Sequence, residues 1–278
     1  MKAAFTLLLM LVTAGLASAQ YYYQDIYGNR QVREEQQRFA QDKVRRQELR
    51  SFDAAGGIDQ DFRIEKTFSA DYRTTRSTTR SLQSGSSVLV TLFDTAGKVI
   101  RSTDSSASSI NISSYTYDSS GHLIRLSFVS RSDSTKEVPG FSEEREYTYS
   151  PTGQLQQMVR RKDGRIRSTV YFRTDGEGRV IEEQEKSAGS PVFHYQWNSA
   201  GALTDIYRYN TARKRMLPDF TFDYDSEGRL KEMLAVDAYS GDYSRWTYEY
   251  NEKGLLSGST CYGKKNVLKG RIIYRYTF

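Results

Sequence analysis

The feature that most constrains this chain is a short motif that returns seven times, best seen in residues 115–123. Each copy has a turn-forming residue three positions before a glycine, and successive glycines are 23 to 32 residues apart. Such turn formers accept a hydrogen bond from the backbone two residues on, and glycine readily adopts a left-handed conformation. The motif therefore predicts a β-hairpin turn at each copy. The predicted turn residues are Asp94 and Gly97, Asp118 and Gly121, Ser150 and Gly153, Asp175 and Gly178, Asn198 and Gly201, Asp225 and Gly228, and Asn251 and Gly254.

Aromatic and aliphatic residues flank each turn at fixed positions. The residue before the turn former and the residue two positions earlier are each aromatic in six of the seven copies. The residue two positions after the glycine is always aliphatic. If Asp118 pairs with His122, Tyr117 lies opposite Leu123, and such a pair stabilises two strands by about 0.2 to 1 kcal/mol relative to alanine. The motif therefore predicts hairpins with one apolar face.

The spacing of the motif leaves room for two strands and a second turn in each copy, which is typical of a repeat architecture. We predict about 14 to 18 strands between residues 62 and 278, with one face of the sheet covered because a flat layer would expose its rings. The predicted fold is all-β: an antiparallel meander of β-hairpin repeats, curled into an open shell, a solenoid or a barrel-like sheet, with a short N-terminal helix.

The pattern Tyr-x-Tyr-Asp-x-x-Gly-x-Leu resembles the YD repeat of the bacterial RHS (rearrangement hot spot) and teneurin proteins. The best matches are residues 115–123 and 222–230, other copies depart from the pattern at single positions, and the likeness covers about residues 89–278. In that family the repeats form a long β-sheet that coils into a shell, often around a toxin domain released after self-cleavage. The likeness here extends to the repeat part alone, so it implies a small exported repeat protein.

The N-terminal residues are typical of a secretory signal. Lys2 supplies the charge, residues 3–15 the apolar core and residues 17–19 the small-residue cleavage site. We therefore predict a signal peptide over residues 1–19 and a secreted protein, located in the periplasm or outside the cell.

The predicted mature chain has two parts. Residues 20–57 are expected to form a polar N-terminal helix and a linker, and residues 58–278 the YD-like β-hairpin repeat domain. The helix has only a sparse apolar stripe, which includes Val32 and Phe39, so we expect it to be solvated and docked weakly on the sheet.

The residues needed for metal or nucleophilic chemistry are scarce. The chain has one cysteine, Cys261, and two histidines, so neither an internal disulfide nor a zinc site is expected. Residues 258–265 approach a phosphate-binding loop, but Lys265 stands where magnesium needs a hydroxyl, so a β-turn is predicted. We predict no cofactor and no enzymatic activity. A carbohydrate-active enzyme with paired carboxylates stays an alternative, because acids are plentiful.

The formal net charge of +6 favours anionic partners. Arg73, Arg76 and Arg80 lie in a threonine-rich tract and are candidate anion contacts; the alternative is a solvated edge strand or loop that the charges protect from pairing. For an exported chain, the expected partner is an anionic polysaccharide or a cell-surface protein, and no nucleic acid is expected. The favoured function is therefore a non-enzymatic binding or surface-structural protein of YD-repeat type.

The C-terminal residues support a rival interpretation. Ile272, Tyr274, Tyr276 and Phe278 alternate with polar residues, as in the last strand of outer-membrane β-barrels. Such barrels need an outward apolar band in every strand. Residues 180–186 place carboxylates on both faces of a strand, so membrane insertion is not expected. An outer-membrane β-barrel ending at Phe278 is the main alternative.

Overall fold

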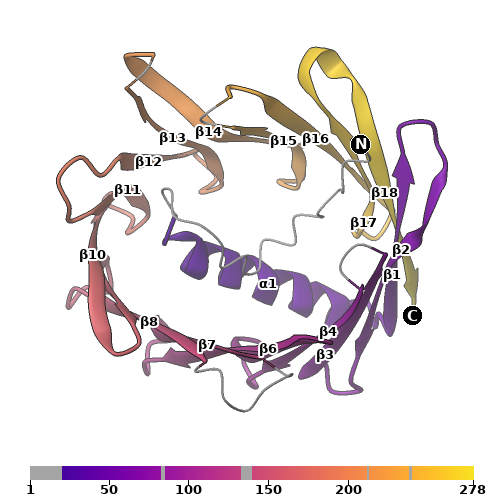
Figure 1. Ribbon diagram of the computed structural model, residues 1–278, viewed down its shortest axis with the longest axis horizontal. Helices are drawn as coiled ribbons and strands as arrows, with labels where there is room; N and C mark the ends of the chain where they lie inside the picture. The colour runs from indigo at the N-terminus through magenta and orange to yellow at the C-terminus, as the bar shows by residue number, and fades with distance from the viewer. Residues whose placement is uncertain (1–20, 83–84, 133–139, 212, 238–239) are drawn as a thin grey trace.

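The chain forms a closed β-barrel around one helix (Figure 1). The computed structural model describes residues 21–82, 85–132, 140–211, 213–237 and 240–278, so the predicted signal peptide lies outside the described residues. The elements are α1 (Gln24–Gln41), β1 (Arg46–Asp53), β2 (Ile58–Phe68), β3 (Thr74–Ser81), β4 (Gly85–Phe93), β5 (Val99–Ser106), β6 (Ser109–Tyr117), β7 (Leu123–Ser132), β8 (Phe141–Tyr149), β9 (Leu155–Lys162), β10 (Arg165–Thr174), β11 (Val180–Glu185), β12 (Val192–Trp197), β13 (Leu203–Asn210), β14 (Arg215–Tyr224), β15 (Leu230–Val236), β16 (Tyr243–Tyr250), β17 (Leu256–Tyr262), a 3₁₀ turn (Lys264–Asn266) and β18 (Leu268–Thr277).

Every strand pairs antiparallel with its neighbours in sequence, and β1 also pairs with β18. This last pairing closes the sheet, so the barrel-like form of the prediction is correct and the open shell and solenoid are wrong. The closing strand β1 precedes all seven motif copies and lacks their pattern, which is why the repeats alone did not reveal closure. The boundary predicted at residue 57 falls in the turn between β1 and β2, both of which belong to the barrel.

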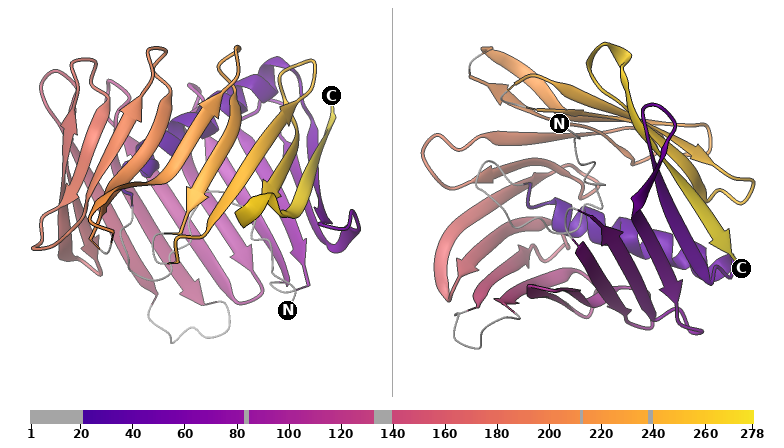
Figure 2. Two further views of the ribbon diagram at one scale, coloured as in Figure 1. Left: turned by 90° about the horizontal axis from the view of Figure 1, so that it is seen from above. Right: turned by 45° about the vertical axis from the view of Figure 1, so that its right-hand side comes forward.

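The seven motif turns all connect an even-numbered strand to the next odd-numbered one. They therefore lie at one end of the barrel, which we call the turn rim; the alternate hairpins lie at the opposite end, the far rim (Figure 2). In the second copy Asp118 N–H donates to the carbonyl of His122 (3.0 Å) and Tyr117 pairs with Leu123, the register predicted from the motif. Gly121 takes a φ of 88°, the left-handed conformation.

A β-bulge follows each motif turn. The register shifts between Thr116 and Tyr117 in the second copy and between Asp223 and Tyr224 in the sixth, and the other copies repeat this shift. Bulges bend a strand and increase its twist. Because the bulge recurs at one end of every motif hairpin, it gives the sheet the curvature that closure requires.

Helix α1 lies inside the barrel rather than on its surface (Figure 1). The Asn29 side-chain amide donates to Tyr117 Oη (2.6 Å), and the Gln36 amide donates to the carbonyl of Tyr72 (2.6 Å). Phe39 is buried and packs on the ring of Phe68, with ring centroids 5.1 Å apart. The prediction of a weakly docked, solvated helix is therefore wrong, because polar side chains of α1 bond to the barrel wall and the few apolar residues of its sparse stripe, such as Phe39, are packed inside.

The apolar face of the sheet lines the barrel, and the opposite face carries ion pairs. The inner cluster around Tyr22 and Tyr23 consists of Leu123, Tyr147, Leu155, Met158, Val170, Phe172, Val180, Phe193, Tyr195, Leu203 and Ile206. In β18, Ile272 is buried and packs with Leu49 and Ile64. The alternating rings of the C-terminal strand thus face the interior. Among the described residues, no helix is long and apolar enough to cross a membrane.

Candidate functional site

In five copies the aromatic residue before the turn links its copy of the motif to the preceding one, and Tyr276 of β18 makes the same link to the seventh copy. The hydroxyl or indole N–H donates to the backbone carbonyl of the aliphatic residue of the preceding copy, over 2.7 to 3.0 Å. The fourth copy has Thr174 in this position, which is too short to reach. The six bonds are Tyr117 to Val99, Tyr149 to Leu123, Trp197 to Val180, Tyr224 to Leu203, Tyr250 to Leu230 and Tyr276 to Leu256.

The turn residues use their side chains within the turns. Asp225 Oδ1 accepts from the N–H groups of Glu227 (3.0 Å) and Arg229 (2.9 Å), and Asp225 Oδ2 accepts from Arg229 Nε (2.8 Å). The other Asp and Asn turn formers make the same backbone contacts. Within the residues that the structure describes, no three His, Cys, Asp or Glu side chains gather so as to hold a metal ion.

A buried carboxylate holds the start of α1. Glu183 of β11 is 2% exposed and accepts hydrogen bonds from the backbone N–H groups of Tyr22 (2.8 Å) and Tyr23 (2.9 Å) and from Tyr195 Oη (2.7 Å). An anion is favourable at a helix N-terminus. Burial nevertheless raises the pKa of Glu183 to about 7, with a smaller contribution from Asp25 and against the three hydrogen bonds. Glu183 is therefore an anchor for the helix.

Ion pairs extend this anchor around the N-terminus of α1. Asp25 pairs with Arg145 (2.6 Å), which also pairs with Glu143 (2.7 Å) on the neighbouring inward position. Arg208 pairs with Asp219 (3.0 Å), and Tyr21 Oη donates to the same carboxylate. Sequence analysis missed this network. Its only signal was a carboxylate on the inner face of residues 180–186, which was interpreted as evidence against a membrane barrel.

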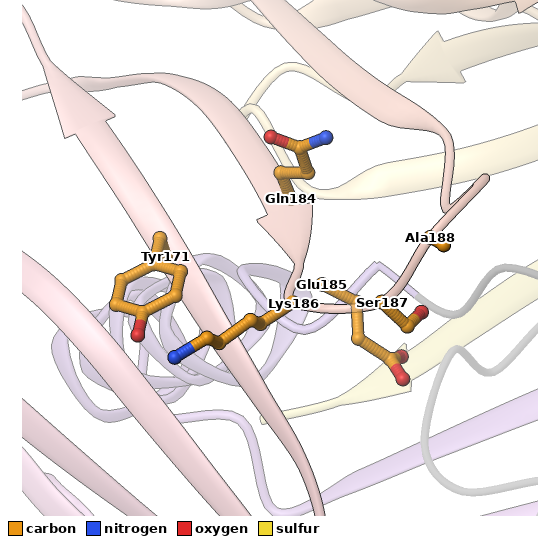
Figure 3. A pocket seen from close by; sticks show the side chains of 6 residues that line it. All are labelled: Tyr171, Gln184, Glu185, Lys186, Ser187 and Ala188. Atoms are coloured by element: carbon orange, nitrogen blue, oxygen red, sulfur yellow. The ribbon is translucent and has the colours of Figure 1, made fainter.

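Two shallow hollows open on the surface. One, of about 410 Å³, lies beside β10 and β11, where the Lys186 ammonium points toward the ring of Tyr171 at 6.0 Å from its centroid (Figure 3). The other, of about 620 Å³, lies at the turn rim. There His122 contacts Asp118 (3.0 Å) and stacks on Tyr149, with ring centroids 4.6 Å apart.

The structure places the three predicted anion contacts on the outside of the barrel. Arg76 and Arg80 lie on β3, and Arg73 directly precedes it; all three are exposed. Their neighbour Thr75 is buried and pairs with the buried Thr91, so these two threonines lie on the inner face of their strands. The tract is neither a loop nor an edge strand, because β3 is paired on both sides with β2 and β4.

These arginines belong to a larger surface, which we call the basic face: the outward side chains of β3 to β7. Arg101 of β5 and Arg131 of β7 are also exposed on it. The sole carboxylate in these five strands is Asp104, on the inner face with the buried Ser102. Sequence analysis missed Arg101 and Arg131 because they are isolated in the sequence, and only the strand register brings them to this face.

Aliphatic and hydroxyl side chains fill the space between the arginines. One row across the strands runs from Arg76 through Val90, Thr103 and Ile112 to Val129. With the described residues, Arg76, Arg80, Arg101 and Arg131 form no ion pair. Other outward arginines are paired: Arg125 of β7 with Glu146, Arg46 and Arg63 with Glu48 and Glu65, Arg161 with Glu146, Arg173 with Glu182, Arg245 with Glu232, and Arg271 with Glu249. Outward Arg50 and Arg275 of the closing strands form no ion pair with the residues that the structure describes.

No family model and no curated protein sequence matches the chain. Similar solved structures include a porin-like protein from Bacteroides uniformis, with 10% identity and a TM-score of 0.39 over 84% of this chain and 98% of that one. Two structures of TcdB2–TccC3, an RHS/YD-repeat toxin complex, give 14% and 9% identity and TM-scores of 0.33 and 0.30. They cover 77% and 86% of this chain, which spans only 12% and 17% of theirs. The link to the repeat family is therefore weak.

Proposed function

We propose that the protein is an exported, non-enzymatic binding protein whose basic face holds an anionic polysaccharide. The observation that carries this proposal is that Arg76, Arg80, Arg101 and Arg131 form no ion pair with any residue that the structure describes, on strands whose outer face has no carboxylate. Arginine presents a planar fork of donors that matches carboxylate, sulfate and phosphate groups. A partner with such anionic groups would neutralise the charges of these arginines.

The size of the basic face suits a polymer better than a small molecule. Strands in a sheet lie about 4.8 Å apart, so β3 and β7 are separated by roughly 19 Å along the row from Arg76 to Val129. The threonine and serine hydroxyls between the arginines can donate to and accept from sugar hydroxyls. A chain of sugars lying across the strands would reach several arginines at once.

The exterior of the barrel argues against membrane insertion as an alternative function. A lipid-facing barrel needs an outward apolar band. Here the outward positions carry charged pairs such as Arg173 with Glu182 and Arg271 with Glu249, while the rings of Tyr147 and Tyr195 face inward. A soluble, exported location fits this distribution. The predicted signal peptide supports the same location.

The placement of the carboxylates supports a non-enzymatic function. A glycosidase needs two carboxyl groups beside a space that admits the sugar. The inward carboxylates of Glu183, Asp25 and Asp219 are instead occupied by the N-terminal segment of the chain and by arginines. No carboxylate lies on the outer side of the basic face. The proposed ligand would therefore be bound without being cleaved.

The test is retention of the purified protein on immobilised alginate, a uronic acid polymer, with neutral dextran as the comparison. We expect salt-sensitive retention on alginate alone, because salt screens exposed charges. The double variant Arg76→Gln/Arg101→Gln should bind about tenfold more weakly, at about 0.7 kcal/mol for each lost contact. Arg173→Gln, an exposed and already paired arginine on another wall, is the matched control. Equal binding by both variants, or no retention at low ionic strength, would refute the proposal.

A further inference from the structure

Exposed apolar side chains gather at the far rim of the barrel. Large apolar residues with more than a third of their surface exposed include Ile166 (63%), Met216 (42%), Val267 (61%) and Leu268 (37%), all at far-rim hairpins. The far-rim hairpins of β1–β2 and β3–β4 add Ile58 and Leu82. At the turn rim the exposed large apolar residues are Ile100 and Phe278, and Phe278 is covered by the Lys253 ammonium (3.7 Å from its centroid). The two ends of the barrel therefore differ in surface chemistry.

Three far-rim hairpins combine these apolar residues with clustered cations. We call them the basic tips; they connect β9 to β10, β13 to β14 and β17 to β18, so they occupy every second far-rim hairpin on that side of the barrel. Each has three arginines or lysines beside its exposed apolar residues. Their residues are Lys162, Arg165, Ile166 and Arg167; Arg213, Lys214, Arg215 and Met216; and Lys264, Lys265, Val267, Leu268 and Lys269.

Two basic tips have a lysine in a backbone conformation that glycine adopts at a lower energy. Lys214 has a φ of 52° and Lys265 a φ of 57°, the left-handed conformation that glycine occupies in all seven motif turns. A side chain with a β-carbon is disfavoured there. With the described residues, Lys214, Arg215 and Lys265 form no ion pair, whereas Lys264 pairs with Asp242 (3.2 Å). The tips therefore keep exposed cations at positions where backbone conformation favours another residue.

We propose that the far rim docks on the surface of an anionic phospholipid bilayer, with Ile166, Met216, Val267 and Leu268 inserted at the interface. Apolar side chains gain free energy by leaving water for the boundary of the acyl chains, and adjacent lysines and arginines attract anionic headgroups. The basic tips provide both kinds of contact at one end of a rigid barrel. The turn rim and the basic face then point away from the bilayer or along it. The inference is independent of the polysaccharide proposal.

A lipid surface explains the tips better than a polysaccharide does. A sugar polymer offers hydroxyl and acidic groups but no apolar phase for Val267 and Leu268. The basic face has the reverse character: its aliphatic residues are half-buried between strands, and its arginines are spread across the sheet. The exposed ends of three hairpins can enter an interface, whereas the side of a barrel meets a planar bilayer along a narrow line.

The first test is co-sedimentation of the purified protein with vesicles of phosphatidylcholine, with or without phosphatidylglycerol. We expect binding only to the anionic vesicles. The triple variant Ile166→Ser/Met216→Ser/Val267→Ser should weaken binding about tenfold or more, and Lys214→Gln/Lys265→Gln about fivefold for each lysine. Ile100→Ser and Lys253→Gln, which change the same residue types at the turn rim, should bind like the wild type. Equal binding by tip and turn-rim variants would overturn the proposal.

The second test reports insertion directly. Cys261 is the sole cysteine of the chain and is buried, so Met216→Cys in a Cys261→Ser background provides one reactive site for an environment-sensitive dye. Anionic vesicles should shift its emission to the blue, and the same dye at Ile100→Cys should not respond. Loss of vesicle binding in Arg76→Gln/Arg101→Gln, without any change in the tip variants, would assign the lipid contact to the basic face and overturn the proposal.

Discussion

Replacing Glu183 with glutamine keeps the shape of the side chain that holds the start of α1 but removes its charge. Burial raises the pKa of Glu183 from 4.5 to about 7. Because the pKa in the folded state is higher than in the unfolded state, the stabilisation from this group is complete below pH 4.5 and is lost as the pH rises through 7. These two pKa values correspond to a loss of about 2.5 kcal/mol between pH 5 and pH 8.

The assay is urea unfolding of the wild type and of Glu183→Gln across this pH range. The free energy of unfolding of the wild type should fall by about 2.5 kcal/mol more than that of the variant, because glutamine does not titrate. The control is Glu249→Gln on the outer face, an exposed carboxylate that pairs with Arg271 (2.7 Å). Its difference from the wild type should stay constant from pH 5 to pH 8. Parallel profiles for the wild type and Glu183→Gln would refute the assigned role of burial.

Two further predictions concern the repeated motif. Tyr224→Phe removes the hydrogen bond from Tyr224 Oη to the carbonyl of Leu203 (2.7 Å) and should lower the free energy of unfolding by about 1 kcal/mol. The control Tyr207→Phe, on the outer face, should have little effect. Equal free energies of unfolding for the two variants in urea would contradict the linking role of the Tyr224 hydroxyl. Gly228→Ala should destabilise the protein by about 1 kcal/mol in the same assay, because Gly228 has a φ of 75° and open space around it; an unchanged or raised stability would remove the conformational argument.

The hairpins could be predicted from the sequence because their determinants are local. An Asx residue, a glycine and two flanking apolar positions define each turn and the register of its strands, as the pairing of Tyr117 with Leu123 shows. The role of the hydroxyl or indole N–H of these aromatic residues could not be predicted from the sequence. The hydroxyl of Tyr224 reaches the backbone of the preceding copy, a contact between residues 21 positions apart. This contact explains why tyrosine or tryptophan rather than phenylalanine predominates before the turns.

Closure and the position of α1 depend on residues that carry no repeat signal. Strand β1 pairs with β18 through a register that begins at Arg46 and Thr277, and neither strand contains the motif. The helix is anchored by Glu183 and by the pairing of Asp25 with Arg145. In the sequence these charged residues cannot be distinguished from solvent-exposed ones. A helix that makes polar contacts inside a barrel has the same composition as a helix on the surface. The sequence of α1 therefore indicated a solvent-exposed helix instead of an enclosed one.

The basic face could be predicted only in part. Arg76 and Arg80 stand out because a charged, threonine-rich tract surrounds them. Arg101 and Arg131 reach the same surface only through the pairing of β3 to β7. The absence of outward carboxylates in those strands is a property of the sheet as a whole, and it depends on Asp104 facing inward. Inward or outward placement follows from register, which the sequence fixes locally at the motif turns but not across the remaining pairings.

Amide hydrogen exchange of β1 and β18 tests the central structural claim, the closure of the hairpin array into a barrel. In a closed sheet both strands are paired on each side, β1 with β2 and β18, and β18 with β17 and β1. Their amides should therefore exchange as slowly as those of the central strands β12 and β13. Rapid exchange of alternate amides along Arg46–Asp53 and Leu268–Thr277 would reveal two free edges and contradict a closed barrel.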